Sequence, residues 1–498
     1  MPDTVIAAAS SAFLARLQAI VGDKGMVSDP QAQSFHQTDW RGYTLGRAAA
    51  VVKPGSVEEV AAIVALCHEQ GVKIVPQGGV TGLVGAGVPV RDGEEIVLSL
   101  ARLNRILDVN PTAYTMTVEA GVVLQTIQET AVAHDRYFPI SLGAQGSCMI
   151  GGNISTNAGG ATVLHYGNTR SMVMGLEVVL PDGRVWDGLR ALKKDNTGYD
   201  LKDLFVGAEG TLGVITKAVI KIFPKPKDVA TAWLAVPDPK AALEVLSGAR
   251  IAADDNVTSC ELMHQLGLDG IFKHIPGTQP PLQDRHTWQV LMEWSSTRPI
   301  PEDGESGMRP RLETYLAECM DKGWVHDAVI AQNEAQAQAF WKIREAHAEA
   351  GRHDDPACSF DISVAVQKIP DFIAACNAAC EKAVPGLRPR PMGHMGDGNL
   401  HYTFSAPVGV NDRAAFAPHV KLLDRIVHDM VAQFDGSISA EHGIGSAKLL
   451  ELEHYRSQTE LDVMRAIKKA LDPKGIMNPG KVIRVDPSEP VQDGSGMR

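Results

Sequence analysis

Residues 76–87 read PQGGVTGLVGAG, with five glycines in ten residues directly after the predicted strand Lys73–Val75. Consecutive glycines let backbone N–H groups converge on an anion and let a pyrophosphate approach the main chain. The segment lacks the Gly-Lys-Ser/Thr ending of a P-loop and the GxGxxG pattern that opens a Rossmann helix. It therefore disfavours an NTPase and a nicotinamide dehydrogenase, and leaves either a phosphate-bearing ligand or a flexible loop.

Two further tracts of small residues follow. Residues 142–160 read LGAQGSCMIGGNISTNAGG, and residues 207–216 read GAEGTLGVIT. Such tracts are either disordered or wrapped around a ligand. Disorder is disfavoured because a strand at 177–180 and its turn at 181–183 come directly after the second tract. Three glycine tracts in one region suggest a single extended ligand that carries phosphates.

Residues 393–401 read GHMGDGNLH. Asp-Gly is preferred in two-residue type I′ hairpin turns, so Asp397-Gly398 predicts a hairpin in which His394 lies opposite His401. The Cβ atoms of such a pair lie roughly 5 Å apart, which suits two imidazoles on one divalent cation. A His-x6-His pattern also arises by chance in proteins that bind no metal.

A third ligand is predicted in SAEHGIG, residues 439–445. The carboxylate of Glu441 would complete a His-His-Glu set with open coordination positions, as catalytic metal sites have. His442 would then be free to act as a general base near neutral pH.

Composition sets the class of protein. A chain of 498 residues is expected to form two or three domains. A net charge of −12 without basic runs disfavours nucleic-acid binding. No apolar stretch reaches 18 residues, so no transmembrane segment is expected, and residues 1–20 predict a surface helix instead of a signal peptide. Seven scattered cysteines without a CxxC pair indicate reduced thiols in a cytoplasmic protein and disfavour an iron–sulfur cluster.

The segment Pro224–Lys227 predicts a domain boundary. Beyond it, alternating strands and helices predict an antiparallel sheet with helices on one face, with the two histidine strands at its edge. A single helix is expected over 332–351, and the tail from Pro487 is expected to be disordered.

Taken together, the motifs resemble those of a known family: the three glycine tracts, KDNTGYDLK at 194–202, GDGNLH at 396–401 and EHG at 441–443. Over residues 40–482 the sequence resembles the FAD-dependent D-2-hydroxy acid dehydrogenases of the vanillyl-alcohol oxidase/p-cresol methylhydroxylase superfamily. The similarity is greatest to the D-2-hydroxyglutarate dehydrogenase branch.

The resemblance implies an α+β fold. A helical segment (1–45) would precede a two-subdomain PCMH-type FAD-binding domain (46–226). A substrate domain with an antiparallel sheet and the metal site (227–430) and a helical segment packing on the FAD domain (431–484) would follow, with a disordered tail (485–498). Non-covalent FAD would contact Pro76, Gln77, Gly78, Gly79, Val80, Thr81, Gly82, Leu83, Leu142, Gly143, Gly146, Ser147, Ile150, Gly151, Gly152, Asn153, Thr156, Asn157, Gly159, Glu209, Gly210, Gly213, Ile215 and Asn478.

The resemblance also implies a zinc or manganese ion on His394, His401 and Glu441, with His442 as the base and Asn399 near the substrate carboxylate. A D-2-hydroxy acid would lose its hydroxyl proton to His442 and its Cα hydride to flavin N5, giving the 2-oxo acid. Electrons would pass to an acceptor such as electron-transfer flavoprotein or a quinone. A homodimer is expected by analogy.

One departure from the family pattern concerns the substrate. Enzymes of this branch that act on D-2-hydroxyglutarate have a motif resembling Trp-x-x-Arg-x-x-x-Thr, followed by a Lys. The Arg, Thr and Lys side chains bind the distal carboxylate of the substrate. Here Arg344 is kept, but Ala348 and Ser359 replace the other two. A buried carboxylate needs charged partners, and two of the three expected contacts to the distal carboxylate are missing. A D-lactate-like substrate therefore fits the sequence as well as D-2-hydroxyglutarate does, unless His347 or Arg352 replaces the missing contacts. Arg344 itself is also consistent with a surface position.

Three rival functions remain open on the sequence. A flavin oxidase would use O2 and often tether FAD covalently, for which His36 and Cys148 are candidates. A flavoprotein subunit of a glycolate-oxidase-like complex would need iron–sulfur partners. A zinc-binding protein without enzyme activity would hold no flavin.

Overall fold

The computed structural model describes residues 10–42, 44–90, 93–300, 302, 307–353 and 355–488. The first nine residues of the expected N-terminal helix and residues 489–498 of the expected tail lie outside these ranges. The chain divides into two compact units: Met1–Ala158, Asn168–Phe223 and His442–Arg498 form the first, and Gly159–Gly167 and Pro224–Glu441 form the second. The second unit thus continues past the expected boundary at 430 and includes a short piece of the second glycine tract.

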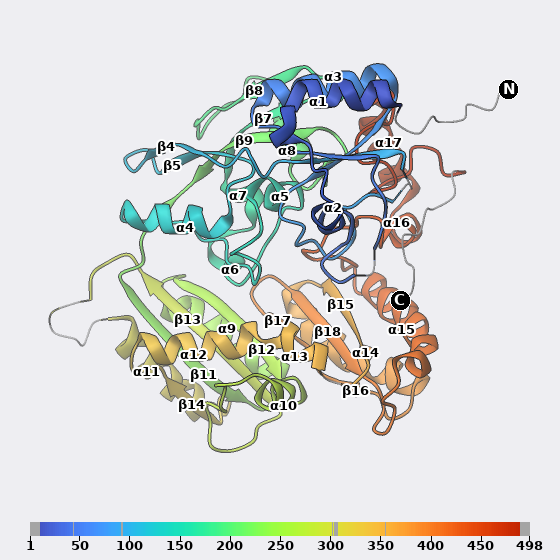
Figure 1. The fold of residues 1–498 in the computed structure, drawn as a ribbon. Coiled ribbons are helices and arrows are strands. Elements are labelled where there is room, and N and C mark those ends of the chain that lie inside the picture. Colours follow the sequence, from blue (N-terminus) through green and yellow to red (C-terminus); the bar gives the residue numbers. More distant parts are fainter. Residues whose placement is uncertain are drawn as a thin grey trace. The chain divides into compact units, whose positions relative to one another are not determined.

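The first unit begins with a three-stranded parallel sheet in the order β1-β3-β2. Its strands are β1 (Ala50–Val52), β2 (Lys73–Gln77) and β3 (Glu95–Ser99). Helix α3 (Val57–Gln70) connects β1 to β2 and begins where the Oγ of Ser56 accepts the backbone N–H of Glu59 at 3.2 Å. Helix α1 (Ser11–Gly25) lies beside α3 (Figure 1), and α2 (Pro30–Gln37) follows.

A five-stranded antiparallel sheet in the order β4-β5-β9-β7-β8 completes the β-structure of this unit. Its strands are β4 (Ile106–Asn110), β5 (Thr115–Glu119), β7 (Val173–Val179), β8 (Val185–Gly188) and β9 (Val214–Lys221). The helices around it are α4 (Leu124–Ala133), α5 (Ile150–Ser155), α7 (Thr169–Met172) and α8 (Lys202–Phe205). Two short strands, β6 (Arg136–Tyr137) and β10 (Phe223–Pro224), pair with each other.

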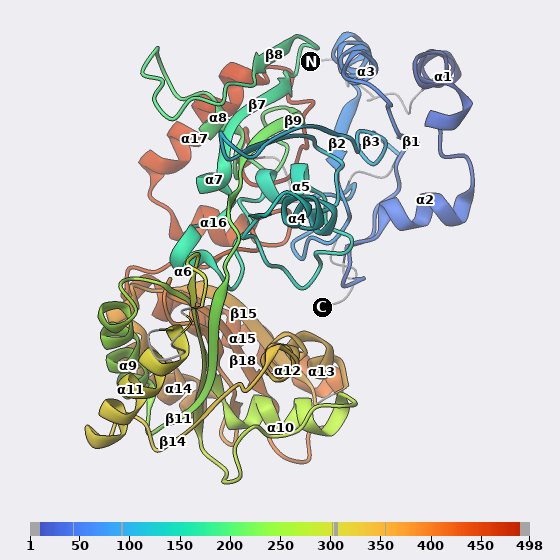
Figure 2. The ribbon, with the colours of Figure 1, turned by 90° about the vertical axis from the view of Figure 1, so that its left-hand side faces the viewer.

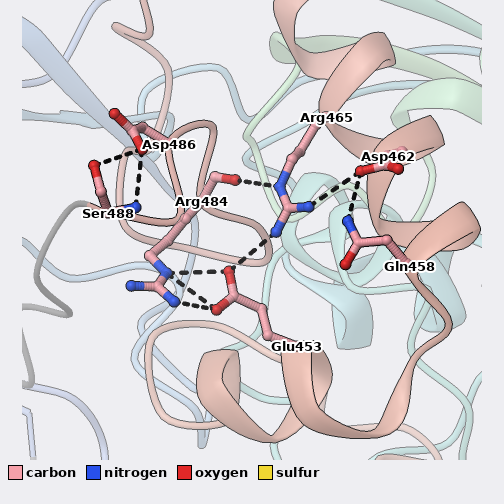
Figure 3. A network of polar contacts seen from close by, with 7 residues as sticks. All are labelled: Glu453, Gln458, Asp462, Arg465, Arg484, Asp486 and Ser488. Carbon is pink, nitrogen blue, oxygen red and sulfur yellow. Dashed lines mark hydrogen bonds and ion pairs between the residues drawn. The ribbon is translucent and has the colours of Figure 1, made fainter.

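The C-terminal segment adds α16 (Leu449–Tyr455) and α17 (Gln458–Leu471) to the first unit. Backbone bonds of 2.8 and 2.7 Å tie Ile476 and Asn478 to Ile74 of β2. Figure 3 shows a polar network that joins both helices to the last described residues, in which Glu453 pairs with Arg484 and Arg465. These contacts hold a segment from the end of the chain beside a strand from its beginning.

The second unit is built on an eight-stranded antiparallel sheet in the order β14-β11-β13-β12-β17-β18-β15, with β16 also paired to β18. Its strands are β11 (Asp228–Val236), β12 (Val257–His264), β13 (Trp288–Ser296), β14 (Asp327–Ile330), β15 (Ala357–Ser363), β16 (Arg388–Pro389), β17 (Met392–His394) and β18 (Asn399–Ser405). The histidine strands β17 and β18 are therefore interior strands, and their expected place at the edge is wrong.

Helices cover both faces of this sheet, which corrects the expectation of a single covered face. Figure 2 shows α9 (Pro239–Ala252), α11 (Met308–Asp321) and α14 (Ile369–Ala383) on one side, with α12 (Glu334–Glu345) and α13 (His347–His353) on the other. Helix α10 (Gln265–His274) joins α12 and α13, because Leu268 and Ile343 belong to one buried cluster. The remaining helices are α6 (Val163–Tyr166), η1 (Val366–Lys368) and α15 (Arg413–Gln433).

The hairpin between β17 and β18 differs from the prediction. His394 pairs with Asn399 and not with His401, so the connection is a four-residue loop, 395–398. Only Gly398 has a positive φ (84°), whereas a type I′ turn needs two such residues. The loop closes because the Gly398 N–H donates to the His394 carbonyl and the Asn399 N–H donates to Asp397 Oδ1. The shift is by an even number of positions, so both histidines still share a face.

Candidate active site

One face of the sheet in the second unit carries two rows of polar side chains. Glu261 on β12, His394 on β17 and Asn399 on β18 are direct cross-strand neighbours. In the next row, His401 lies opposite Asp361 on β15. Alternate residues of a strand project to the same face, so strand register alone brings together residues that are far apart in the sequence.

A cluster of side chains that could bind a metal ion forms where this face meets Glu441. Asp361, His401 and Glu441 each offer one ligand atom, and these atoms lie within 4.8 Å of one another. His401 Nε2 is 3.6 Å from Glu441 Oε1, and the backbone N–H of Glu441 donates to Asp361 Oδ2 at 3.0 Å. Gly159 lies against the same carboxylate, because a Cβ there would be 3.3 Å from Glu441 Oε2.

The electrostatics of this cluster suit a cation. The pKa of Glu441 is raised to about 7, because burial outweighs the opposing effect of His394 and the Asp361 carboxylate adds to the rise. Two crowded carboxylates and an imidazole are a donor set that a divalent cation relieves of its repulsion. The residues present therefore fit a bound metal ion.

His394, the first predicted ligand, takes part in a buried chain of charged groups. Its Nδ1 lies 2.6 Å from Glu261 Oε1, and Glu261 Oε2 accepts a 2.6 Å bond from Arg344 Nε. Burial alone would raise the pKa of the fully buried Glu261, but Arg344 and His394 hold it down at about 2. The His394 and His401 rings are 5.3 Å apart between centroids, so His394 is adjacent to the cluster and its role as a ligand stays a prediction.

The substrate residues expected from the sequence lie on the same unit. Asn399 donates from Nδ2 to Asp361 Oδ1 at 2.9 Å and to the Ile362 carbonyl, which leaves its buried Oδ1 as an acceptor without a partner among the described residues. This buried acceptor therefore suits a hydroxyl or a cation better than the carboxylate expected there. Arg344 is half-buried on α12 beside Glu261 and is not a surface residue.

His442 is the predicted base. It follows Glu441 directly in the chain and begins the last segment of the first unit. The trans peptide bond keeps the Cα atoms of these two residues about 3.8 Å apart. Its catalytic role stays a prediction.

The predicted cofactor residues, apart from Gly159, belong to the first unit. A Cβ on Gly79 would lie 2.1 Å from the Ser147 carbonyl, so the first two glycine tracts pack backbone against backbone. Gly82, Gly143 and Gly152 are different, since a Cβ on any of them would meet no atom within 4 Å. None of these three has a positive φ. Glycine at these positions therefore leaves space beside the backbone, as a bound cofactor requires.

Buried acceptors point to the same conclusion. Asn478 donates from Nδ2 to the carbonyls of Glu209 (2.7 Å) and Ala86 (3.0 Å), and its Oδ1 is buried without a partner among the described residues. Asn153 Oδ1 is in the same situation. Buried acceptors are normally hydrogen-bonded. The N–H groups of FAD can donate to them, so these residues fit that cofactor. Glu209 instead accepts the backbone N–H groups of Ile444 and Gly445.

Comparison with known proteins agrees with this geometry. Residues 48–188 match the family described as "FAD binding domain", and residues 225–482 match "FAD linked oxidases, C-terminal domain". The chain is 36% identical to D-2-hydroxyglutarate dehydrogenase, mitochondrial, of Arabidopsis thaliana over 93% of its own length and 80% of that protein. It is 37% identical to D-2-hydroxyglutarate dehydrogenase of Xanthomonas citri pv. viticola, over 94% and 96% of the two chains.

The chain belongs to the D-2-hydroxyglutarate dehydrogenase family of FAD-linked oxidases. It is an FAD-dependent oxidoreductase related to D-2-hydroxyglutarate dehydrogenases, which confirms the family and enzyme class predicted from the motifs. Another family relative, at 34% identity over 90% of this chain and 89% of its own, is a D-2-hydroxyglutarate–pyruvate transhydrogenase of Saccharomyces cerevisiae.

Solved structures support the predicted α+β fold. p-Cresol methylhydroxylase matches with a TM-score of 0.73 at 16% identity, covering 95% of this chain and 96% of that one. An alkyldihydroxyacetonephosphate synthase matches with a TM-score of 0.71 at 18% identity, covering 94% and 84%. At these identities the likeness shows the fold alone. No helix among the described residues is both long and apolar enough to cross a membrane.

Two residues proposed as covalent tethers in an oxidase of this superfamily are buried. His36 is 4% exposed, and its Nδ1 contacts the Gln77 side chain, which in turn donates to the His36 carbonyl at 2.9 Å. Cys148 is 3% exposed. His36 thus braces the first glycine tract from α2.

The sequence did not reveal Glu261 and Asp361. Each is a single acidic residue inside an apolar strand, in SCELM and SFDIS. An isolated charge in a strand that is otherwise buried is the signal that was available, because such a group needs a partner.

Proposed function

We propose that the protein oxidises a D-2-hydroxy acid, D-2-hydroxyglutarate or a D-lactate-like acid, to the 2-oxo acid, using non-covalent FAD and a divalent cation. The observation that carries the proposal is the cluster of Asp361, His401 and Glu441, in a chain of this family. It lies on a sheet face whose Glu261 bonds the half-buried Arg344 of α12. A metal-type donor set beside a cation suits a substrate with a hydroxyl and a carboxylate.

The proposed metal ligands are His394, His401 and Glu441, and Asp361 is a further donor within reach. Nitrogen and oxygen donors together suit zinc or manganese. When bound, the cation supplies Lewis acidity that lowers the pKa of the substrate hydroxyl. The Glu261 carboxylate can only accept a hydrogen bond, so the proton of neutral His394 resides on Nδ1. The other ring nitrogen, Nε2, then carries the lone pair that can bind the metal.

The proposed role of His442 is to accept the hydroxyl proton, and its peptide bond to Glu441 supports this role. Arg344 is proposed to hold a substrate carboxylate. Its Nε is fixed by Glu261 and its Nη2 lies 3.5 Å from His394 Nε2, so Nη1 remains as an oriented donor. FAD, which the glycine tracts of the first unit would hold, supplies the hydride acceptor. Electrons then pass to a separate acceptor such as electron-transfer flavoprotein or a quinone.

The test is anaerobic reduction of the FAD-loaded protein, followed by flavin absorbance. D-2-hydroxyglutarate, D-lactate, D-malate and their L forms are added separately. We expect bleaching by a D acid, its loss after chelation and its return with zinc or manganese. Bleaching that survives complete removal of the metal would overturn the metal proposal. No bleaching by any of the D acids would overturn the proposed reaction.

A further inference from the structure

A cavity in the second unit lies beside the candidate active site. Two arginines, Arg344 and Arg390, line it together with His347 and the apolar side chains of Met263, Leu268 and Met392. Arg344 already has a place in the proposed function. Arg390 does not, and nothing in the sequence singled it out.

Strand register fixes the position of Arg390. This residue is 4% exposed and lies between β16 and β17, where its backbone N–H donates to the Thr403 carbonyl at 2.8 Å. The pairs on either side, Pro389 with Phe404 and Met392 with His401, place Arg390 opposite Thr403. Arg390 is therefore one row beyond His401 on the same face, roughly 7 Å along the strand. An arginine side chain can bridge that distance.

The same row contains one of the two positions at which the sequence departs from the family pattern. Ser359 pairs with Thr403, and the two hydroxyl oxygens are 3.0 Å apart. The row thus holds Arg390, Thr403 and Ser359 across adjacent strands. The pattern implies a lysine at the position of Ser359. The cation that is missing from β15 is therefore present at the other end of the same row.

The charges around the cavity favour an anion. Burial, together with the charges of Arg390 and Arg344, lowers the pKa of His347 to about 3, so this imidazole is neutral near pH 7. Glu261 is engaged by Arg344 and His394. Arg390 also has other contacts within the protein. A role in binding is supported by its position in the row and by its place in the lining of the cavity.

We propose that Arg390 is a specificity-determining residue, which with Arg344 binds an anionic group at the far end of the 2-hydroxy acid. This inference rests on the proposed function and deepens it, because Arg390 would select substrates with a second carboxylate over monocarboxylates of equal length. A carboxylate that leaves water requires charged donors, and a guanidinium offers it two parallel N–H groups.

The experiment compares two acids of equal chain length, D-2-hydroxyglutarate and D-2-hydroxyvalerate, which lacks the second carboxylate. Steady-state turnover of the FAD-loaded enzyme, with a dye as electron acceptor, gives KM and kcat for each. For Arg390→Met we expect KM for D-2-hydroxyglutarate to rise about 10- to 100-fold, the loss of a charge-assisted contact. We expect kcat to stay within about twofold, and both constants for D-2-hydroxyvalerate to change no more than about twofold.

Two further variants separate binding from folding. Arg390→Lys keeps a cation and is expected to recover part of the lost affinity. In Arg390→Met, adding Ser359→Lys restores a cation to the same row and is expected to lower KM for D-2-hydroxyglutarate again without changing KM for D-2-hydroxyvalerate. The matched control is Arg388→Met, two residues earlier, where the guanidinium pairs with Asp355 and the Ala406 carbonyl. This control is expected to leave the preference between the acids unchanged.

The outcomes are distinguishable. If the wild-type flavin is reduced by neither acid, the proposed function is wrong and this inference falls with it. If the wild type is reduced but shows no preference for the dicarboxylate, only the inference is overturned. A purely structural role for Arg390 predicts equal losses for both acids and no recovery with Ser359→Lys, and that result would also overturn it.

Discussion

The two units build their candidate binding sites from different parts of the chain. In the first unit, the candidate site is made by backbone, and glycines such as Gly82, Gly143 and Gly152 leave space beside it. In the second unit, the site is made by side chains such as Glu261, His394 and His401, which strand register gathers from β12, β17 and β18.

This difference predicts two kinds of sensitivity to mutation. A side-chain site loses its function when one donor atom is removed, although the strands that present it keep their packing. A backbone site has no single donor to remove, so it fails when an added Cβ pushes the chain or fills the space of the ligand.

The largest effect is expected for His401→Asn in the second unit. The strand pairing of β18 does not depend on the imidazole, but a metal ligand is lost. We expect the rate of flavin reduction and the affinity for zinc or manganese to fall more than about 100-fold, since even supporting residues of metal ligands cost 10- to 100-fold. Elemental analysis measures the metal, and stopped-flow absorbance measures the rate.

The matched control for His401→Asn is His419→Asn, an exposed histidine on α15 of the same unit. It is expected to change neither quantity. If His401→Asn keeps its full metal content, His401 is not a metal ligand. The proposal that strand register assembles the metal site would then be wrong.

In the first unit, the informative pair is Gly79→Ala and Gly82→Ala. A Cβ on Gly79 would lie 2.1 Å from the Ser147 carbonyl, so the two tracts must separate, and we expect lower stability and loss of FAD. A Cβ on Gly82 meets nothing within 4 Å, and φ is not positive there. This variant is expected to keep the stability of the FAD-free protein and to lose about 10-fold or more in FAD affinity by steric exclusion.

Flavin fluorescence measures the affinity for FAD, and thermal unfolding of the FAD-free protein measures stability. If Gly82→Ala binds FAD as tightly as the wild type, the space beside Gly82 is not part of the cofactor site. If Gly79→Ala is as stable as the wild type, the two tracts can separate at little cost.

The same contrast explains how much the sequence could predict. The glycine tracts are contiguous, so the FAD-binding domain was predicted from its motifs, while the individual residues that contact FAD stay a prediction. Glu261 and Asp361 were missed because their proximity to the histidines exists only after β12 and β15 take their places beside β17 and β18. A motif records what one segment does, whereas register depends on every strand of the sheet.

Local errors have local causes. The helix expected over 332–351 breaks at Ala346, where no glycine or proline marks the end of α12. Helix α10 was missed because its two glycines lower its helix propensity. The hairpin loop was expected to be shorter because Asp397-Gly398 favours a two-residue turn, yet the Asp397 side chain is used to accept the Asn399 N–H.

A medium effect is expected from His264, which caps α10 in the second unit. Its Nδ1 accepts the Leu266 N–H at 3.2 Å, which only a neutral imidazole can do. Burial lowers its pKa from 6.5 to about 4. Between these values the unfolded chain binds more protons, so stability falls as pH drops from 6.5 towards 4, by up to about 3 kcal/mol.

His264→Asn keeps a capping oxygen but does not titrate. We expect the difference in unfolding free energy between wild type and this variant to change across that pH range and to be constant above it. Urea unfolding at several pH values measures this difference. His274→Asn at the other end of the helix is the control. A difference independent of pH would mean that the cap does not depend on protonation.

The smallest effect is expected from Glu453→Gln in the first unit. Glu453 pairs with Arg484 and, at 3.6 Å, with Arg465, and all three side chains remain partly exposed (Figure 3). Because the three side chains are only 12 to 17% exposed and glutamine keeps a hydrogen-bond acceptor while losing the charge, we expect a loss of about 1 to 2 kcal/mol in urea unfolding and unchanged FAD affinity. Asp462→Asn, at the exposed edge of the network, is the control. A large loss of FAD in Glu453→Gln would show that the backbone site of the first unit depends on distant side chains after all, which would break the contrast between the units.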